Sequence, residues 1–418
     1  MTKANILLYS QKGISYMVKT GDLKFIQELN RSIILNTIRQ HGPISRSDIA
    51  KKIGVSPTTV TAAVHELIQQ GLVIEDGTGE SSGGRKPILL KFAPDSKQIL
   101  AVSITNTDIT VGEVNLGAEV KRKSTYTFAN FREQNVIDYT VQAIRQFQDE
   151  CEEGRAWIGI SVIAPGIVDT KKGVIRYNSR LNLHDVPLKA VLEEAFGIEV
   201  WIDNDVNALV LAEKKFGGYD HVENMIYVKL GDGVGAGLIV NGEIYRGLSG
   251  GAGEFGHMSI DRAGIRCECG NRGCIDTYIN WPAVYSRVVM DLTRGKPSIM
   301  TEWIDGDYSK LTPELLNRAI LNGDHLAMDV MEDVARYLAN GLINLINLMN
   351  PSVIVIGGEV FQGNERFRSY VHALISDHSM SLFSEDLQLV FTSFGRDFEL
   401  IGAAAVMLQD IFRSPLTR

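Results

Sequence analysis

The stretch GGAGEFGHMSIDRAGIRCECGNRGCID, residues 250–276, contains three of the four cysteines in this 418-residue chain. The candidate metal ligands in it are His257, Cys267, Cys269 and Cys274. Three thiolates and one imidazole close a tetrahedral zinc shell and leave no position for a reacting water, so the pattern predicts a structural zinc rather than a catalytic one. Three incidental thiols near a histidine are the alternative, and such close spacing disfavours it.

Carboxylates lie at both ends of this segment. Glu254 precedes His257 by three residues, so a single helical turn would place both side chains on one face. Asp276 follows the last cysteine by two residues. If zinc holds the segment in place, both carboxylates and one edge of the imidazole can point into a common cleft.

The composition indicates a cytoplasmic protein of two or three domains. A chain of this length with 44% hydrophobic residues can build several ordinary cores. It has no apolar run long enough to span a membrane and no secretory signal at its N-terminus. Only Cys151 lies outside the cluster, which suits a reducing compartment better than a disulfide framework.

The net charge of −8 is unevenly distributed along the chain. Residues 1–92 carry 12 Lys and Arg against 7 Asp and Glu, a balance of +5, which leaves −13 for the remainder. A basic head on an acidic body indicates a polyanion-binding module attached to a second, different domain.

Residues 22–92 have the pattern of a winged helix-turn-helix. Helices are predicted at 22–40, at 45–54, and from an N-cap at Ser56 with Pro57 in the first turn. The last two, joined by residues 54–56, form the helix-turn-helix. Strands at 71–75 and 87–92 would form the wing, whose tip is the sequence SSGGRK, residues 81–86. Residues 1–21 show no clear pattern and are expected to form a loose arm.

The head is therefore expected to bind DNA. The predicted contact residues are Arg46, Ser56, Thr58, Thr59, Thr61, His65, Arg85 and Lys86. Short hydroxyl side chains reach phosphates and base edges in a major groove, and a flexible Arg-Lys tip can place a guanidinium in a minor groove. A protein-interaction domain with a solvated hairpin is the alternative, and the basic balance disfavours it. Because one such head binds weakly, a homodimer or tetramer on a palindromic operator is expected.

After residues 93–95 the pattern becomes that of an α/β body with mixed sheets and a cleft, residues 93–418. Strands are predicted at 99–105, 109–116, 120–128, 157–163, 200–202, 227–230, 235–240 and 352–356. Helices are predicted at 136–147, 187–196, from Val206, at 326–349 and at 400–412, with a turn at 165–169.

Residues 22 to about 412 resemble the ROK family of repressors, open reading frames and sugar kinases. The resemblance rests on GEFGH at 253–257 with the cysteines that follow, DNDVNA at 203–208 and GDGVGAG at 231–237. It implies a two-lobed α/β actin-like (ribonuclease H-like) ATPase-type fold with a structural zinc segment, behind an N-terminal winged helix-turn-helix. PISR at 43–46, SSGGRKP at 81–87 and YNS at 177–179 look most like the family's xylose repressors.

The same resemblance implies a sugar site. Its contacts would be Gly166, Asn178, Ser179, Asn204, Asp205, Glu254, His257 and Asp276. Carboxylates, amides and an imidazole suit sugar hydroxyls, which both donate and accept hydrogen bonds. Asp276 departs from the family, which usually has Glu there, so its carboxylate reaches one methylene less. For Asp205 the alternative is a helix-capping role.

In the family's kinases Asp205 would be the general base, and a glycine-rich turn after the first strand would approach the phosphates. Here that stretch is AVSITNTD, residues 101–108, which lacks both glycines and the acidic residue. We therefore expect no ATP-dependent enzyme but a sugar-responsive repressor, released from its operator by free sugar, xylose by similarity. A ROK kinase phosphorylating a hexose with ATP, with an added DNA-binding head, is the alternative. A zinc-stabilised scaffold without a ligand is disfavoured by the convergent polar residues.

Overall fold

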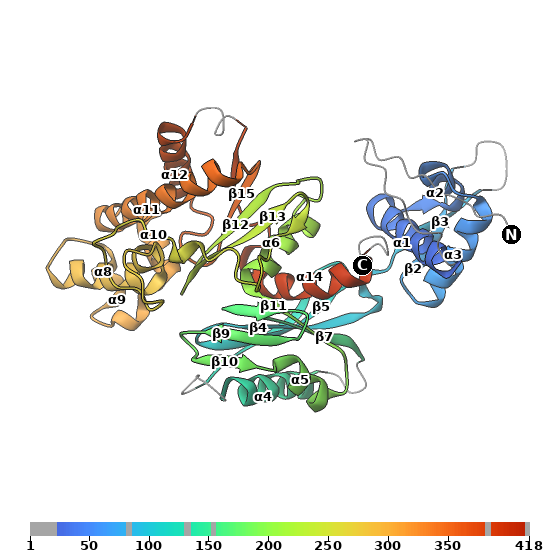
Figure 1. Cartoon of the computed structure of the whole chain (residues 1–418), viewed down its shortest axis with the longest axis horizontal. Coiled ribbons are helices and arrows are strands. Elements are labelled where there is room, and N and C mark those ends of the chain that lie inside the picture. The colour runs from blue at the N-terminus through green and yellow to red at the C-terminus, as the bar shows by residue number, and fades with distance from the viewer. Residues whose placement is uncertain (1–22, 81–85, 129–134, 152–155, 381–385, 414–418) are drawn as a thin grey trace. The chain divides into compact units, whose positions relative to one another are not determined.

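The computed structural model describes residues 23–80, 86–128, 135–151, 156–380 and 386–413 (Figure 1). The chain forms two compact units. The first comprises Met1–Gln98, Asn115–Gly117 and Met407–Arg418, and the second comprises Ile99–Val114 and Ala118–Val406. The head predicted from the sequence ends at residue 92, whereas the first unit also takes in a turn and the C-terminal end of the chain. The predicted arm, 1–21, lies outside the described residues.

The first unit contains the predicted winged helix-turn-helix. Its elements are α1 (Leu23–His41), β1 (Ile44–Ser45), α2 (Arg46–Ile53), α3 (Pro57–Gln69), β2 (Val73–Thr78), β3 (Ile88–Phe92) and the 3-10 helix η1 (Pro94–Ser96). Ser56 caps α3 by accepting from the Thr59 N–H, and α2 ends at Gly54 in the left-handed conformation. The strand order is β1-β3-β2, so β1 adds a third strand that the sequence did not predict.

The last helix of the chain, α14 (Phe398–Phe412), ends in the first unit. The Phe412 ring meets Phe92 edge to face, with 5.8 Å between ring centroids, and the Arg39 guanidinium carbon lies 4.4 Å from the Phe412 centroid. The Asn36 amide donates to the Phe412 carbonyl at 3.2 Å. This helix therefore begins in one unit and has its last turn packed in the other.

The first sheet of the second unit has the order β11-β7-β4-β5-β6. Its strands are β4 (Gln98–Ile104), β5 (Asp108–Asn115), β6 (Val120–Thr127), β7 (Trp157–Ala164) and β11 (Val200–Asn204). Helices α4 (Asn135–Asp149) and α5 (Leu188–Phe196) cover one face (Figure 1). On the other face the Ser161 hydroxyl donates to the Ala403 carbonyl of α14. Parallel β7 and β11 bring their carboxyl ends to the same edge.

A small antiparallel sheet follows β7, formed by β8 (Ile167–Asp169), β9 (Val174–Asn178) and β10 (Leu183–Val186). The prediction of a simple turn at 165–169 was wrong for residues 167–169, because β9 pairs with them as β8. Gly166 has φ +94°, and a side chain there would meet the Tyr177 carbonyl. Pro165 and Gly166 therefore form the turn between β7 and β8, and the turn predicted from the sequence is shorter than expected.

The second sheet has the order β14-β13-β12-β15-β16. Its strands are β12 (Met225–Leu230), β13 (Val234–Val240), β14 (Glu243–Ile244), β15 (Val353–Gly357) and β16 (Gln388–Phe391). Around it lie α7 (Asp276–Ile279), α8 (Trp281–Thr293), α9 (Met300–Ile304), α10 (Pro313–Leu321), α11 (His325–Met349) and α12 (Glu365–His378), with 3-10 helices η2 (Phe255–His257), η3 (Tyr308–Lys310) and η4 (Gly395–Asp397). Of the helices around this sheet, only α11 was predicted from the sequence.

Helices α6 (Asp205–Phe216) and α14 lie between the two sheets. Leu209 and Val210 of α6 and Phe398 of α14 share a buried cluster with Tyr227 and Val355 of the second sheet. This arrangement of two helix-covered sheets agrees with the predicted actin-like body. Nowhere in the described part of the chain is there a helix long and apolar enough to cross a membrane.

Candidate functional site

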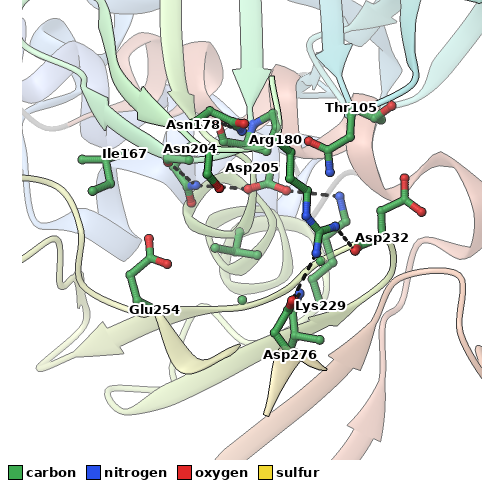
Figure 2. A pocket seen from close by; sticks show the side chains of 18 of the residues that line it. Thr105, Ile167, Asn178, Arg180, Asn204, Asp205, Lys229, Asp232, Glu254 and Asp276 are labelled. Atoms are coloured by element: carbon green, nitrogen blue, oxygen red, sulfur yellow. Dashed lines mark hydrogen bonds and ion pairs between the residues drawn. The ribbon is translucent and has the colours of Figure 1, made fainter. Parts of the chain in front are cut away.

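A pocket of about 620 Å³ opens between elements of the second unit (Figure 2). All eight residues expected to contact sugar line it: Gly166, Asn178, Ser179, Asn204, Asp205, Glu254, His257 and Asp276. They come from the ends of β7, β9 and β11, from the start of α6, from η2 and the residue before it, and from the start of α7. The structure thus brings together residues that are more than one hundred positions apart in the sequence.

Asp205 faces the pocket instead of capping its helix. The N-cap of α6 is Asn204, whose side-chain oxygen accepts from the Asn207 N–H at 3.1 Å. The Asn204 amide nitrogen donates to the Gly166 carbonyl at 2.9 Å and to Asp205 Oδ1 at 3.1 Å. The capping alternative for Asp205 is therefore wrong, because its neighbour performs that role.

Asn178 ties together the segments that follow β7 and β9 at the rim of the pocket. The Asn178 side chain is buried, donates to the Pro165 carbonyl at 3.1 Å and accepts from the Leu181 N–H at 2.7 Å. Ser179, the next residue, is exposed. Asn178 thus fixes the shape of this rim, and Ser179 leaves its hydroxyl at the pocket surface.

A buried lysine that the sequence reasoning missed is central to the pocket. Lys229 Nζ in β12 lies 3.1 Å from Asp205 Oδ2 and 2.7 Å from Glu399 Oε1, and Glu399 also accepts from the Ser103 hydroxyl. Burial alone would lower the pKa of Lys229, but Glu399 and Asp205 raise that pKa well above its usual value. A charged residue in the apolar strand MIYVKL was the available signal.

Arg180 is a second residue that the sequence reasoning missed. It donates to Asp276 Oδ2 at 3.1 Å and to the Asp232 carbonyl, so it reaches from the segment after β9 to the β12–β13 turn and α7 (Figure 2). Asp276 also accepts from the Val234 N–H and from the Asn280 amide, each at 2.9 Å. The Asp276 carboxylate, buried and bound by three donors, is mainly occupied by the protein itself.

In the turn after β4, the Thr105 side chain binds backbone groups of the same turn. Thr105 Oγ1 accepts from the Thr107 N–H at 3.2 Å and from the Asp108 N–H at 3.1 Å, and the Thr105 N–H donates to the Asp108 carbonyl at 3.0 Å. Burial raises the pKa of Asp108. Three backbone N–H groups of this turn, those of Thr105, Thr107 and Asp108, are thus already bonded within it and are not directed at a phosphate.

The four predicted metal ligands form one cluster, and all their ligand atoms lie within 4.8 Å of one another. Cys267 Sγ is 3.5 Å from His257 Nδ1, and Cys269 Sγ is 3.7 Å from Cys274 Sγ. Tetrahedral zinc with Zn–S bonds of about 2.3 Å would hold its sulfurs about 3.8 Å apart, so the cluster fits this ion. His257 Nε2 remains directed at Glu254, 3.8 Å from Oε2. One imidazole can therefore serve the metal cluster with one nitrogen and the pocket with the other.

The predicted DNA-contacting residues are distributed over α2, α3 and the wing. Those that are exposed are Ser56, Thr58, Thr61, His65 and Lys86, with Thr59 and Arg46 half-buried. Arg46 pairs with Glu75 of β2 at 2.9 Å, and the Thr61 hydroxyl donates to the Pro57 carbonyl. Arg85 lies outside the described residues. Along α3, polar groups thus occupy the face opposite the buried Val60, Val64 and Leu67.

Comparison with known proteins agrees with this division of the chain. The sequence model of the MarR family matches residues 29–74, and that of the ROK family matches residues 99–410. The transcriptional dual regulator NagC of Escherichia coli (strain K12) is 32% identical over 371 residues, which is 88% of this chain and 90% of that protein. A xylose repressor of Bacillus subtilis (strain 168) is 29% identical over 395 residues, 93% of this chain and 97% of that protein.

Solved structures show the same architecture. A ROK family transcriptional regulator, a homolog of the E. coli MLC protein, matches with a TM-score of 0.79 and 29% identity over 94% of this chain and 98% of its own. A ROK family glucokinase from Streptomyces griseus matches 73% of this chain and 98% of its own with a TM-score of 0.64 and 24% identity, which supports the fold alone.

A MarR-type DNA-binding head in front of an actin-like body defines a class of transcription regulator built on a sugar-kinase fold. The chain belongs to the ROK family, and within it the chain is a transcriptional repressor of sugar metabolism. The predicted family membership is thereby confirmed.

Proposed function

We propose that this repressor binds its operator as a homodimer and releases it when free sugar enters the pocket. The observation that carries the proposal is the convergence of the eight predicted sugar-contact positions, seven of them polar, on one pocket in a chain with a DNA-binding head. Sugar bound there would stabilise one state of the pocket, and the operator would be bound by the other state. Among sugars we propose xylose, on the likeness to the Bacillus subtilis xylose repressor.

The same pocket is poorly suited to phosphoryl transfer. A general base must be free to take a hydroxyl proton, whereas Asp205 is paired with the Lys229 ammonium. In the turn after β4 the Thr107 and Asp108 N–H groups are bound by Thr105 Oγ1, which makes the turn a poor cradle for a phosphate. We therefore propose that the chain binds sugar without phosphorylating it.

The His257 and cysteine cluster would hold one structural zinc ion. Zinc would fix the loop that carries Glu254 and His257 relative to Asp276, and so would set the pocket wall. The ligand set is complete with four protein groups, so the metal would supply no Lewis-acid chemistry to the sugar.

For the DNA side we propose that two heads read the two halves of a palindrome. Thr58 and Thr59 of α3 would contact the duplex, and the wing tip would reach an adjacent minor groove. Two weak heads on one dimer bind much more tightly than one, because the second binding step is intramolecular.

The test combines a sugar panel with operator binding. The full chain is screened by thermal shift against free sugars, since a ligand of the native state raises the melting temperature. Operator affinity is then measured with and without the sugar that binds, in the parent and in Asp205→Asn. Asp185→Asn is the matched control, because Asp185 is exposed and lies outside the pocket.

Asp205→Asn is expected to keep operator binding and to lose the sugar response, whereas Asp185→Asn keeps both. Equal release of operator in the parent and in Asp205→Asn would remove Asp205 from the sugar site. If no sugar in the panel altered operator affinity of the parent, the inducer model would be wrong.

A further inference from the structure

Arg180 spans the pocket from one wall to the other (Figure 2). Its backbone lies between β9 and β10, and its neighbour Leu181 is buried in the apolar cluster of the first sheet. Its guanidinium donates to Asp276 Oδ2 at 3.1 Å and to the Asp232 carbonyl. Asp232 lies in the turn between β12 and β13, and Ile275, next to Asp276, is buried in the apolar cluster of the second sheet. Arg180 therefore connects the two sheets across the pocket.

The Asp276 carboxylate is shared between donors from both walls. The Val234 N–H and the Asn280 amide bind it at 2.9 Å each, and both residues are buried on the same wall as Asp276 itself. Of these three donors, Arg180 alone comes from the opposite wall. A carboxylate has about four acceptor positions, and the donors within its own wall stay with it. A ligand hydroxyl that binds Asp276 from the pocket therefore competes with Arg180.

Arg180 has a second carboxylate within reach. Its Nε lies 3.6 Å from Glu268 Oε2, and the Glu268 side chain is 68% exposed on the loop between Cys267 and Cys269. An arginine that loses Asp276 can therefore remain paired with Glu268, so the exchange leaves no cation without a partner. Arginine suits such an exchange because its planar fork carries five N–H donors.

A second arginine connects the sheets in a different way. Arg246, which follows β14, binds Asp203 of β11 through two hydrogen bonds of 2.6 Å each. The Asp203 side chain is 1% exposed, and neither residue lines the pocket. A ligand in the pocket can therefore compete for Asp276 but not for Asp203. The Arg246 connection is permanent, whereas the Arg180 connection is exchangeable.

We propose that Arg180 is a positioning residue that stabilises the ligand-free, operator-binding arrangement of the pocket, and that the effector acts by taking Asp276 from it. The guanidinium then moves outward to Glu268, which changes how the two walls are held relative to each other. An exchange between two discrete positions is a two-state element that a ligand can bias. This inference rests on the proposed sugar response and specifies how the pocket is regulated.

The test measures sugar and operator binding in Arg180→Gln, which removes the guanidinium and keeps a polar side chain. Calorimetry on the full chain uses a panel of free sugars that includes xylose, glucose and N-acetylglucosamine. Operator affinity is measured by titration without sugar, and the melting temperature is recorded. Arg176→Gln is the matched control, because Arg176 of β9 pairs at the surface with Asp185 and lies outside the pocket.

The two affinities of Arg180→Gln should change in opposite directions. Sugar should bind at least about threefold more tightly, because no cation competes for Asp276. Operator should bind at least about threefold more weakly without sugar, because the arrangement that binds DNA has lost its connection. Arg176→Gln should keep both affinities. A purely structural loss would instead weaken both and lower the melting temperature.

The outcomes separate this inference from the proposed function. If sugar binds Arg180→Gln no more tightly than it binds the parent, or if operator affinity is unchanged, the exchange is overturned and the sugar-binding function stands. If no sugar of the panel binds either protein, the sugar-binding function is overturned, and the exchange with it.

Glu268→Gln tests the outer position of the guanidinium and serves if Arg180→Gln does not fold. It keeps Arg180 and all four cluster residues but removes the carboxylate that receives the displaced arginine. Sugar should then bind at least about threefold more weakly. Unchanged sugar affinity in Glu268→Gln, or a sugar-bound crystal structure in which Arg180 still donates to Asp276, would refute the exchange.

Discussion

Replacing Lys229 with Met should destabilise the second unit more than any surface change. Methionine keeps most of the side-chain volume but leaves Asp205 and Glu399 without their counter-ion. The three side chains are only 14–16% exposed, so water screens the pair weakly. Removing one partner of a buried pair costs about 3–5 kcal/mol, which corresponds to a melting-temperature loss of roughly 5–8 °C for a unit of this size.

The stability lost in Lys229→Met should depend on pH, and the direction of this dependence follows from the pKa of Glu399. Burial alone would raise the pKa of Glu399, but Lys229 outweighs it and holds that pKa below its usual value. A lowered folded pKa contributes stability that is present at neutral pH and is lost as the pH falls through it. Without Lys229, burial is opposed only by the Ser103 hydrogen bond, so the pKa of Glu399 should rise and the variant should lose less stability in acid. The difference in melting temperature between parent and variant should be largest at neutral pH and should become smaller toward pH 4.

Scanning calorimetry of both proteins between pH 4 and pH 8 measures this difference. The matched control is Lys215→Met, because Lys215 lies on α6 and pairs with Asp220 at the surface, where an ion pair contributes at most about 1 kcal/mol. If Lys229→Met melted no lower than Lys215→Met at neutral pH, the buried ion pair would not have the role assigned to it here.

Three further predictions concern the metal, the pocket and the wing. In Cys269→Ser, elemental analysis should find no stoichiometric zinc, and sugar binding should be weaker. If the parent protein, purified without chelator, held no zinc, the metal site would be refuted. Desolvation by the surrounding residues raises the pKa of Glu359 to about 7, so stability falls as pH rises through that value. Part of this side chain nevertheless reaches solvent, which screens its charge, so Glu359→Gln should relieve the loss by no more than about 1 kcal/mol in melts at pH 5 and pH 8. Arg85→Ala should weaken operator binding and lower its salt slope by about one, and unchanged titrations at several salt concentrations would contradict the wing assignment.

What the sequence predicted well depended on local signals. The helix-turn-helix follows from Ser56, Pro57 and Gly54, which set the ends of two helices regardless of the rest of the chain. The ligand cluster follows from spacing within residues 257–274, and α11 follows from a long apolar periodicity. In each case the deciding interactions join residues close together in the sequence.

What the sequence did not predict depended on distant partners. Lys229 meets Glu399 across 170 positions, and Arg180 meets Asp276 across 96. The sequence around each of these residues does not reveal its distant partner, because charged residues are usually exposed. The strand β8 was missed for the same reason, because three residues become a strand only when β9 pairs with them. The sequence therefore predicted the pocket carboxylates Asp205, Glu254 and Asp276 but not the two cations, Lys229 and Arg180, that lie beside them.

The elements through which sugar binding would affect the DNA-binding head are those that have one end in each unit. Strand β4 starts at Gln98 in the first unit and ends at Ile104 in the pocket wall, while β5 starts at Asp108 in that wall and ends at Asn115 in the first unit. Helix α14 likewise carries Glu399 in the pocket and Phe412 in the first unit.

Within the first unit these ends are held firmly. The Leu116 N–H donates to the Pro94 carbonyl at 3.0 Å, and Asn115 donates to Asp95 at 2.7 Å, so residues 115 and 116 are bound to the segment that follows the wing. Rigid elements with one end in each unit can transmit a two-state change without a dedicated relay of side chains. A sugar that shifts Glu399 or the Ile104–Asp108 turn would then alter operator affinity by the usual coupling of roughly 1–3 kcal/mol. Because such coupling is reciprocal, operator DNA would weaken sugar binding by the same factor if sugar releases the operator as proposed.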